Sequence, residues 1–119
     1  MKHEEIARLN PNQIDQAISR NEPDELSRAV LSAALYADDW QWAESVCVRL
    51  SGHENANVRG NAVLGFGHIA RINRNLTESR VRPLIEDALR DEDAYVRGHA
   101  DSAADDVELF LRWRINRSQ

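Results

Sequence analysis

Seven consecutive residues of this chain occur twice with few changes. Residues 56–62 read Ala-Asn-Val-Arg-Gly-Asn-Ala and residues 94–100 read Ala-Tyr-Val-Arg-Gly-His-Ala, so four residue types recur at a constant offset of 38 residues. A period of this length is typical of solenoid repeats, whose units bury their apolar faces only by stacking on one another. The repeat therefore predicts a chain of stacked, similar units.

Both copies open a segment whose apolar residues follow helical spacing. One face of the first segment carries Val58, Ala62, Gly65, Phe66 and Ile69. The corresponding face of the second carries Val96, Ala100, Ala103, Ala104 and Val107. A shorter amphipathic segment precedes each of them, at residues 40–50 and 81–89. The β-branched residues also sit at helical spacing, so no strand is expected.

An earlier part of the chain fits the same scheme without the repeated peptide. Asn10-Pro11 is a typical helix start, and Asn21 to Asp24 separates two further amphipathic segments. We therefore predict three antiparallel helix pairs, over residues 11–37, 39–72 and 77–114, in one domain spanning residues 1–119. A short leading helix is expected over residues 2–9.

The second helix of each later pair resembles the inner helix of HEAT repeats, which often opens with an acidic turn followed by Val-Arg, two residues and Ala. Here Asn55 precedes Val58-Arg59-Gly60-Asn61-Ala62, and Asp93 precedes Val96-Arg97-Gly98-His99-Ala100. The first pair departs from the pattern, because Leu26-Ser27-Arg28-Ala29 lacks Val-Arg. The resemblance implies an all-α, right-handed α-solenoid of about three HEAT-like helix pairs.

A narrower resemblance concerns three segments, residues 62–71, 81–84 and 101–107. They are similar to small bacterial HEAT-repeat proteins found beside toxin genes, some of which are immunity proteins of contact-dependent growth inhibition or related polymorphic toxin systems. The resemblance implies a protein that binds one cognate toxin domain and blocks its active site, with no enzymatic activity of its own.

Charge favours a basic protein as the partner. The chain has 15 Lys and Arg against 20 Asp and Glu, a net charge of −5. Acidic residues concentrate between Glu86 and Glu108, where only Arg90 and Arg97 oppose them. This charge repels nucleic acid and suits the basic active site of a toxin that acts on nucleic acid.

Two groups of acidic residues are candidates for contact with that partner. Asp101, Asp105 and Glu108 follow helical i, i+4, i+7 spacing, which gathers like charges at a small cost in stability. They form either a patch for a basic partner or a solvated face partly neutralised by Arg112. Asp38 and Asp39 form the second group, at the junction of the first two pairs.

Aromatic residues provide the remaining candidates. One of Trp40 and Trp42 is expected in the core and the other beside the two carboxylates, where it would anchor an interface. Tyr95 occupies an outward position on its helix, and His99 follows one turn later. The expected partner-binding residues are therefore Asp38, Asp39, Trp42, Tyr95, His99, Asp101 and Asp105.

Other repeat residues have structural interpretations. Arg59 and Arg97 match the arginine that joins neighbouring HEAT repeats, and Asp91 or Asp93 is the expected partner of Arg59. The glycines inside the predicted helices, including the equivalent Gly60 and Gly98, indicate close approach between helices, because glycine there costs about 1 kcal/mol relative to alanine.

No pattern indicates a cofactor or a metal. The histidines have no metal-ligand spacing, and Cys47, the only cysteine, lies on an apolar helix face as a buried, inert thiol. The absence of a possible disulfide, of a signal peptide and of a membrane span favours a cytoplasmic protein. It is expected to be a monomer or weak dimer when free, with no nucleic acid or membrane as partner.

Two other functions remain as alternatives. A HEAT-repeat adaptor or scaffold of an endogenous protein complex would have the same sequence features. A HEAT-type enzyme that acts on nucleic acid, or a lyase-like member, would be longer and, if it bound DNA, basic. The sequence therefore favours a protein-binding role.

Overall fold

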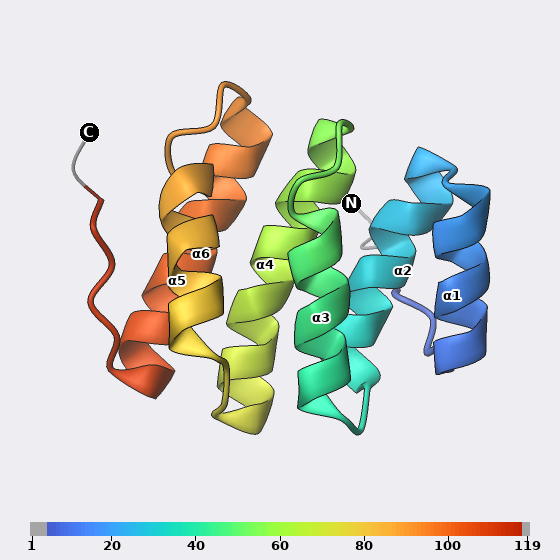
Figure 1. Cartoon of the computed structure of the whole chain (residues 1–119), viewed down its shortest axis with the longest axis horizontal. Coiled ribbons are helices and arrows are strands. Elements are labelled where there is room, and N and C mark those ends of the chain that lie inside the picture. The colour runs from blue at the N-terminus through green and yellow to red at the C-terminus, as the bar shows by residue number, and fades with distance from the viewer. Residues whose placement is uncertain (1–4, 118–119) are drawn as a thin grey trace.

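The chain folds into helices that run back and forth, and the helix pairs stand side by side in one row (Figure 1). The structure is a computed structural model that describes residues 5–117, and in that range it contains no strand. Its helices are α1 (Pro11–Arg20), α2 (Pro23–Tyr36), α3 (Trp40–Leu50), α4 (Ala56–Asn73), α5 (Glu78–Ala88) and α6 (Ala94–Leu111). The predicted all-α fold class is confirmed, whereas the HEAT assignment and the right-handed sense of the stack stay predictions.

Five of the six described helices begin at a residue whose side chain accepts a local hydrogen bond from the helix backbone. Asn10 caps α1, where its side chain accepts a hydrogen bond from the backbone N–H of Gln13 and the Gln13 side chain accepts one from the Asn10 N–H. The side chains of Glu22, Asp39, Asn55 and Asp93 cap α2, α3, α4 and α6. The first turn of α5 relies on a distant residue instead, because Glu44 of α3 accepts the Thr77 N–H at 2.6 Å.

The expected leading helix over residues 2–9 does not form in its described part. Residues 5–10 are not helical. The Leu9 N–H donates to Ser32 Oγ of α2 at 2.9 Å, which holds this segment across α2. Pro11 also disfavours a helical conformation at the residue before it. Residues 2–4 of the expected helix lie outside the described residues.

The last helix ends earlier than its apolar pattern indicates. Arg112 has a φ of 59° and ends α6 in the left-handed conformation. Residues 113–117 then run back beside α6 as a non-helical C-terminal segment. Trp113 and Ile115 of that segment pack partly buried against the core. They cover apolar surface at the end of the row, which a further helix pair would otherwise bury.

The core lies between two layers of helices. The longer helix α4 packs against α2 on one side and α6 on the other, and also contacts α3 and α5. Phe66 and Ile69 of α4 are fully buried, as are Ile85 of α5 and Val96 of α6. Three of the glycines meet neighbouring helices, because a Cβ at Gly60, Gly65 or Gly67 would lie within 3 Å of another residue's atoms.

The repeat arginine joins two neighbouring helix pairs. Arg59 of α4 donates to both carboxylate oxygens of Asp91, in the α5–α6 turn, at 2.8 and 2.9 Å. Both side chains are only 16% exposed. The expected pairing of Arg59 with Asp91 is therefore confirmed. The equivalent Arg97 donates to the backbone oxygen of Asp91.

Candidate protein-binding surface

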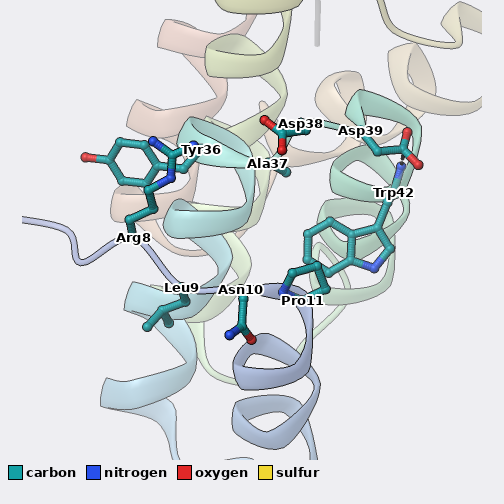
Figure 2. Close-up of a pocket in the computed structure, with 9 residues that line it drawn as sticks. All are labelled: Arg8, Leu9, Asn10, Pro11, Tyr36, Ala37, Asp38, Asp39 and Trp42. Atoms are coloured by element: carbon teal, nitrogen blue, oxygen red, sulfur yellow. Dashed lines mark hydrogen bonds between the residues drawn. The ribbon is translucent and has the colours of Figure 1, made fainter.

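A pocket opens where the N-terminal segment passes the junction of α2 and α3. Its volume is about 490 Å³. Figure 2 shows its lining, which comes from the segment before α1, the end of α2 and the start of α3. We call it the N-terminal pocket; its lining residues are Arg8, Leu9, Asn10, Pro11, Tyr36, Ala37, Asp38, Asp39 and Trp42. Three of the seven expected contact residues, Asp38, Asp39 and Trp42, are thus brought together.

The two carboxylates of this pocket differ in their local contacts. One oxygen of Asp39 accepts the backbone N–H of Gln41 at 2.9 Å and that of Trp42 at 3.3 Å, so this residue begins α3. Asp38 is exposed and has no hydrogen bond or ion pair to any described residue. The pocket therefore presents one free carboxylate and one that is only partly satisfied by a helix N-terminus.

The opposite end of the pocket holds an arginine on an aromatic ring. The guanidinium carbon of Arg8 lies 5.7 Å from the centroid of the Tyr36 ring, within the range of a cation–π contact. In Figure 2 these two side chains lie away from Asp39 and Trp42. Sequence reasoning missed both residues, because no local pattern links a residue before α1 with the last turn of α2.

The expectation for the two tryptophans of α3 is wrong. Trp40 and Trp42 are both half-buried and both pack against the core, so neither is the fully buried partner of an exposed one. They lie in the first turn of α3, at the edge of the helix row, where each side chain keeps part of its surface in solvent. Trp42 therefore offers part of its indole to the N-terminal pocket.

Tyr95 and His99 lie on the side of α6 that faces α4. The centroids of their rings are 4.2 Å apart, and the Tyr95 hydroxyl donates to Asn61 Oδ1 of α4 at 2.6 Å. The Tyr95 ring also covers Gly60, where a Cβ would lie 2.8 Å from it. Tyr95 is still 41% exposed, so the expected outward position is only partly correct: the hydroxyl points inward and part of the ring faces solvent.

A polar cluster lies beside these rings. Arg71 Nη2 is 3.0 Å from His68 Nδ1 on α4. Burial, helped by the charges of Arg71 and His99, lowers the pKa of His68 to about 4. Burial also lowers the pKa of His99 and raises that of Asp106. At neutral pH the facing sides of α4 and α6 therefore bring the neutral imidazoles of His68 and His99 close to Arg71 and Asp106.

Asp101, Asp105 and Glu108 form an acidic ridge on another side of α6. Arg117 of the C-terminal segment donates to all three, at 3.0, 2.8 and 2.6 Å. The residue that partly neutralises the ridge is therefore Arg117, and the expectation of Arg112 is wrong. Arg112 ends α6 and turns the chain, whereas Arg117 returns far enough along α6 to reach the ridge. Three carboxylates around one guanidinium keep a net negative charge.

The seven expected residues do not form one continuous site. The junction with Asp38, Asp39 and Trp42 lies at the lower edge of the row in Figure 1, and the turn before Tyr95 lies at the upper edge near the other end. The acidic ridge faces the C-terminal segment instead of α4. The structure thus separates the candidates into the N-terminal pocket, the inner side of α6 and the acidic ridge.

Three further features concern metal binding, thiol chemistry and membrane spanning. Between residues 5 and 117 no group of three His, Cys, Asp or Glu side chains is placed to hold a metal ion. Burial raises the pKa of the Cys47 thiol to about 12, so it stays protonated at neutral pH. None of the helices described is long and apolar enough to cross a membrane.

Comparison with known proteins finds similarity among solved structures. No protein-family model matches the chain, and no curated protein does. Among solved structures, the chain is similar to one in the crystal structure of a CDI complex from Cupriavidus taiwanensis LMG 19424, with 28% sequence identity and a TM-score of 0.80. The match covers 92% of this chain and 97% of that one, so this chain resembles a component of a CDI complex over nearly its whole length.

Proposed function

We propose that this chain is an immunity protein of contact-dependent growth inhibition or a related toxin system. It binds a cognate toxin domain and neutralises it by covering the active site. The observation that carries this proposal is the full-length similarity, at 28% identity, to a chain of a CDI complex. A match that covers 97% of the other chain supports a shared binding role more strongly than a match to one helix pair would.

The mechanism we propose is steric and electrostatic, with no reaction catalysed by this chain. A stable interface of ordinary size buries about 1,600 Å² in total, more than one pocket provides. The N-terminal pocket and the acidic ridge each present carboxylates to solvent, and the whole chain has a charge of −5. A toxin that acts on nucleic acid has a basic active site, which such carboxylates attract and fill in place of phosphates.

Calorimetric titration with the C-terminal domain of the adjacent gene's product, as the candidate toxin domain, tests the proposal directly. We expect tight binding, and we expect growth of a bacterium that expresses the toxin domain to recover when this chain is co-expressed. The paired substitution Asp101→Lys and Asp105→Lys is expected to weaken binding about tenfold or more without loss of helicity by circular dichroism. A wild-type chain that neither binds nor protects would overturn the proposed function.

Two further variants separate the acidic ridge from general charge effects. Asp15→Lys with Asp87→Lys makes the same change of charge on α1 and α5, and is expected to leave affinity nearly unchanged at physiological salt. Arg117→Ala releases the ridge from its internal guanidinium and is expected to tighten binding. Unchanged affinity in both ridge variants would remove the ridge from the interface while leaving the proposed function intact.

A further inference from the structure

We infer that the N-terminal pocket is a receptor for one arginine side chain of the partner. This inference rests on the proposed function, because it names the chemistry by which the toxin domain is held. The ligand class assigned to the pocket is the guanidinium group, and the residues assigned to contact it are Asp38, Asp39 and Trp42, which all line the pocket.

Carboxylates provide the charge that an incoming guanidinium needs. Asp38 has no partner among residues 5–117, so nothing in this range competes for it. The Asp39 side chain uses one oxygen, Oδ1, for both backbone hydrogen bonds, so within residues 5–117 its other oxygen makes no hydrogen bond. A planar guanidinium has five N–H donors and binds such oxygens more specifically than the ammonium of lysine does.

Aromatic surface provides the second part of the recognition. Trp42 is half-buried, and Figure 2 shows its indole beside Pro11 and below Asp39. The face of an indole attracts a guanidinium more strongly than other aromatic side chains do. A guanidinium stacked on Trp42 therefore lies in the same pocket as the two carboxylates.

Arg8 explains why the other end of the pocket is closed to a second cation. Its guanidinium already lies against Tyr36. With two aspartates and one arginine, the charged lining of the pocket has a net charge of −1. Arg8 therefore limits the pocket to one cation and directs it to the Trp42 end. Its removal is expected to strengthen cation binding.

The volume of the N-terminal pocket is large enough for a side chain inserted from a partner. A volume of about 490 Å³ exceeds that of one arginine side chain. It lies within the range of roughly 300–1,000 Å³ that is usual for ligand pockets. The additional space accommodates the backbone on either side of the arginine, as expected for a loop of a folded domain.

A small probe tests the pocket without any toxin. Nα-acetyl-L-arginine methylamide is titrated into the full chain, and the indole N–H resonance of Trp42 is followed by NMR. The citrulline analogue, which has nearly the same shape and no charge, serves as the control probe. We expect saturable shifts of the Trp42 signal with the arginine probe and at least about fivefold weaker binding of the citrulline probe.

Matched variants locate the recognition. Asp38→Asn and Asp39→Asn each remove one charge, and asparagine caps a helix as well as aspartate does, so α3 is retained. Each is expected to weaken the arginine probe severalfold, whereas Asp87→Asn on α5 is expected to have no effect and Arg8→Gln to tighten binding. Equal binding of both probes, or unchanged binding in Asp38→Asn and Asp39→Asn, would overturn the inference.

The same variants with the toxin domain distinguish this inference from the proposed function. We expect Asp38→Asn and Trp42→Leu to weaken toxin binding, and Asp87→Asn to bind as the wild type. A toxin that binds equally well to all of them contradicts the arginine pocket but not the immunity role. Probe binding with no toxin binding contradicts both, because the inferred ligand is the partner's arginine.

Discussion

Tyr95 Oη donates a hydrogen bond of 2.6 Å to Asn61 Oδ1, which joins α6 to α4. The amide nitrogen of Asn61 in turn donates to the backbone oxygen of Ser27 in α2 at 3.0 Å. One buried asparagine therefore connects all three longer helices. Because Asn61 is only 7% exposed, water is poorly placed to replace a lost partner.

Substitution Tyr95→Phe removes the hydroxyl and keeps the ring over Gly60. We expect the free energy of unfolding to fall by about 1–2 kcal/mol, because the carbonyl oxygen of Asn61 is left without its donor. Urea unfolding followed by circular dichroism measures the change. The control is Tyr36→Phe, since the Tyr36 hydroxyl has no hydrogen bond within the described residues, and it is expected to change stability by less than about 0.5 kcal/mol.

The equivalent glycines of the repeat are expected to respond oppositely to alanine. A Cβ at Gly60 would lie 2.8 and 2.9 Å from ring carbons of Tyr95, whereas a Cβ at Gly98 would have no atom within 4 Å. Gly98→Ala is therefore expected to stabilise the protein by about 0.5–1 kcal/mol through helix propensity. Gly60→Ala is expected to destabilise it by roughly 1–3 kcal/mol through overpacking. Thermal unfolding of both variants measures the contrast, and a gain of stability in both would contradict it.

The Arg59–Asp91 pair is expected to couple two helix pairs energetically. A double-mutant cycle with Arg59→Met and Asp91→Asn should give a coupling of about 1–2 kcal/mol, because the bond is bidentate and largely buried. The exposed pair Glu78–Arg82, at 3.4 Å, is the control, with an expected coupling of about 0.3–0.5 kcal/mol. Equal couplings in the two cycles would show that Arg59 has no special role between repeats.

His68 is expected to make stability depend on pH in the weakly acidic range. Its pKa is about 4 in the folded protein against an ordinary value of 6.5, so the unfolded chain binds the proton more tightly. Stability due to the neutral imidazole is therefore complete above the ordinary pKa, decreases as pH falls between these values, and levels off below about 4.

The substitution His68→Gln isolates this effect from the titration of the carboxylates. We expect the difference in unfolding free energy between wild type and variant to change with pH between about 6.5 and 4, and to be constant above that range. An NMR titration of the imidazole checks the pKa directly, with the nearby Arg71, His99 and Asp106 retained. A His68 pKa close to 6.5 would contradict the expectation.

Much of the helical architecture was accessible from the sequence because its signals are local or repeated. The 38-residue offset places Arg59 one repeat before Arg97, and the turn before the second copy contains Asp91 and Asp93, so the resemblance to HEAT repeats predicted that Arg59 contacts one of these two aspartates. The same logic explains the open space at Gly98. This glycine copies Gly60, but no later helix is present among the described residues to approach it.

The remaining features depend on contacts that no local pattern encodes. The N-terminal pocket needs Arg8 to reach Tyr36, and the acidic ridge needs residue 117 to return to residues 101–108. Both contacts are made by non-helical segments, one before α1 and one after α6. The spacing of residues in the sequence does not predict in which direction such segments run. The two tryptophans of α3 failed for a related reason, because burial at the edge of a layer depends on neighbouring segments.

The helices are unequally connected: α4 touches four others, whereas α1 packs mainly against α2. Local opening is therefore expected to begin at α1, and amide protons there should exchange with solvent sooner than those of α4. The wall of the N-terminal pocket includes Pro11, the first residue of α1, together with Trp42 of α3. A ligand that contacts both Pro11 and Trp42 links α1 to the second helix pair. Ligand binding is therefore expected to slow amide exchange in α1, the helix with the fewest packing contacts.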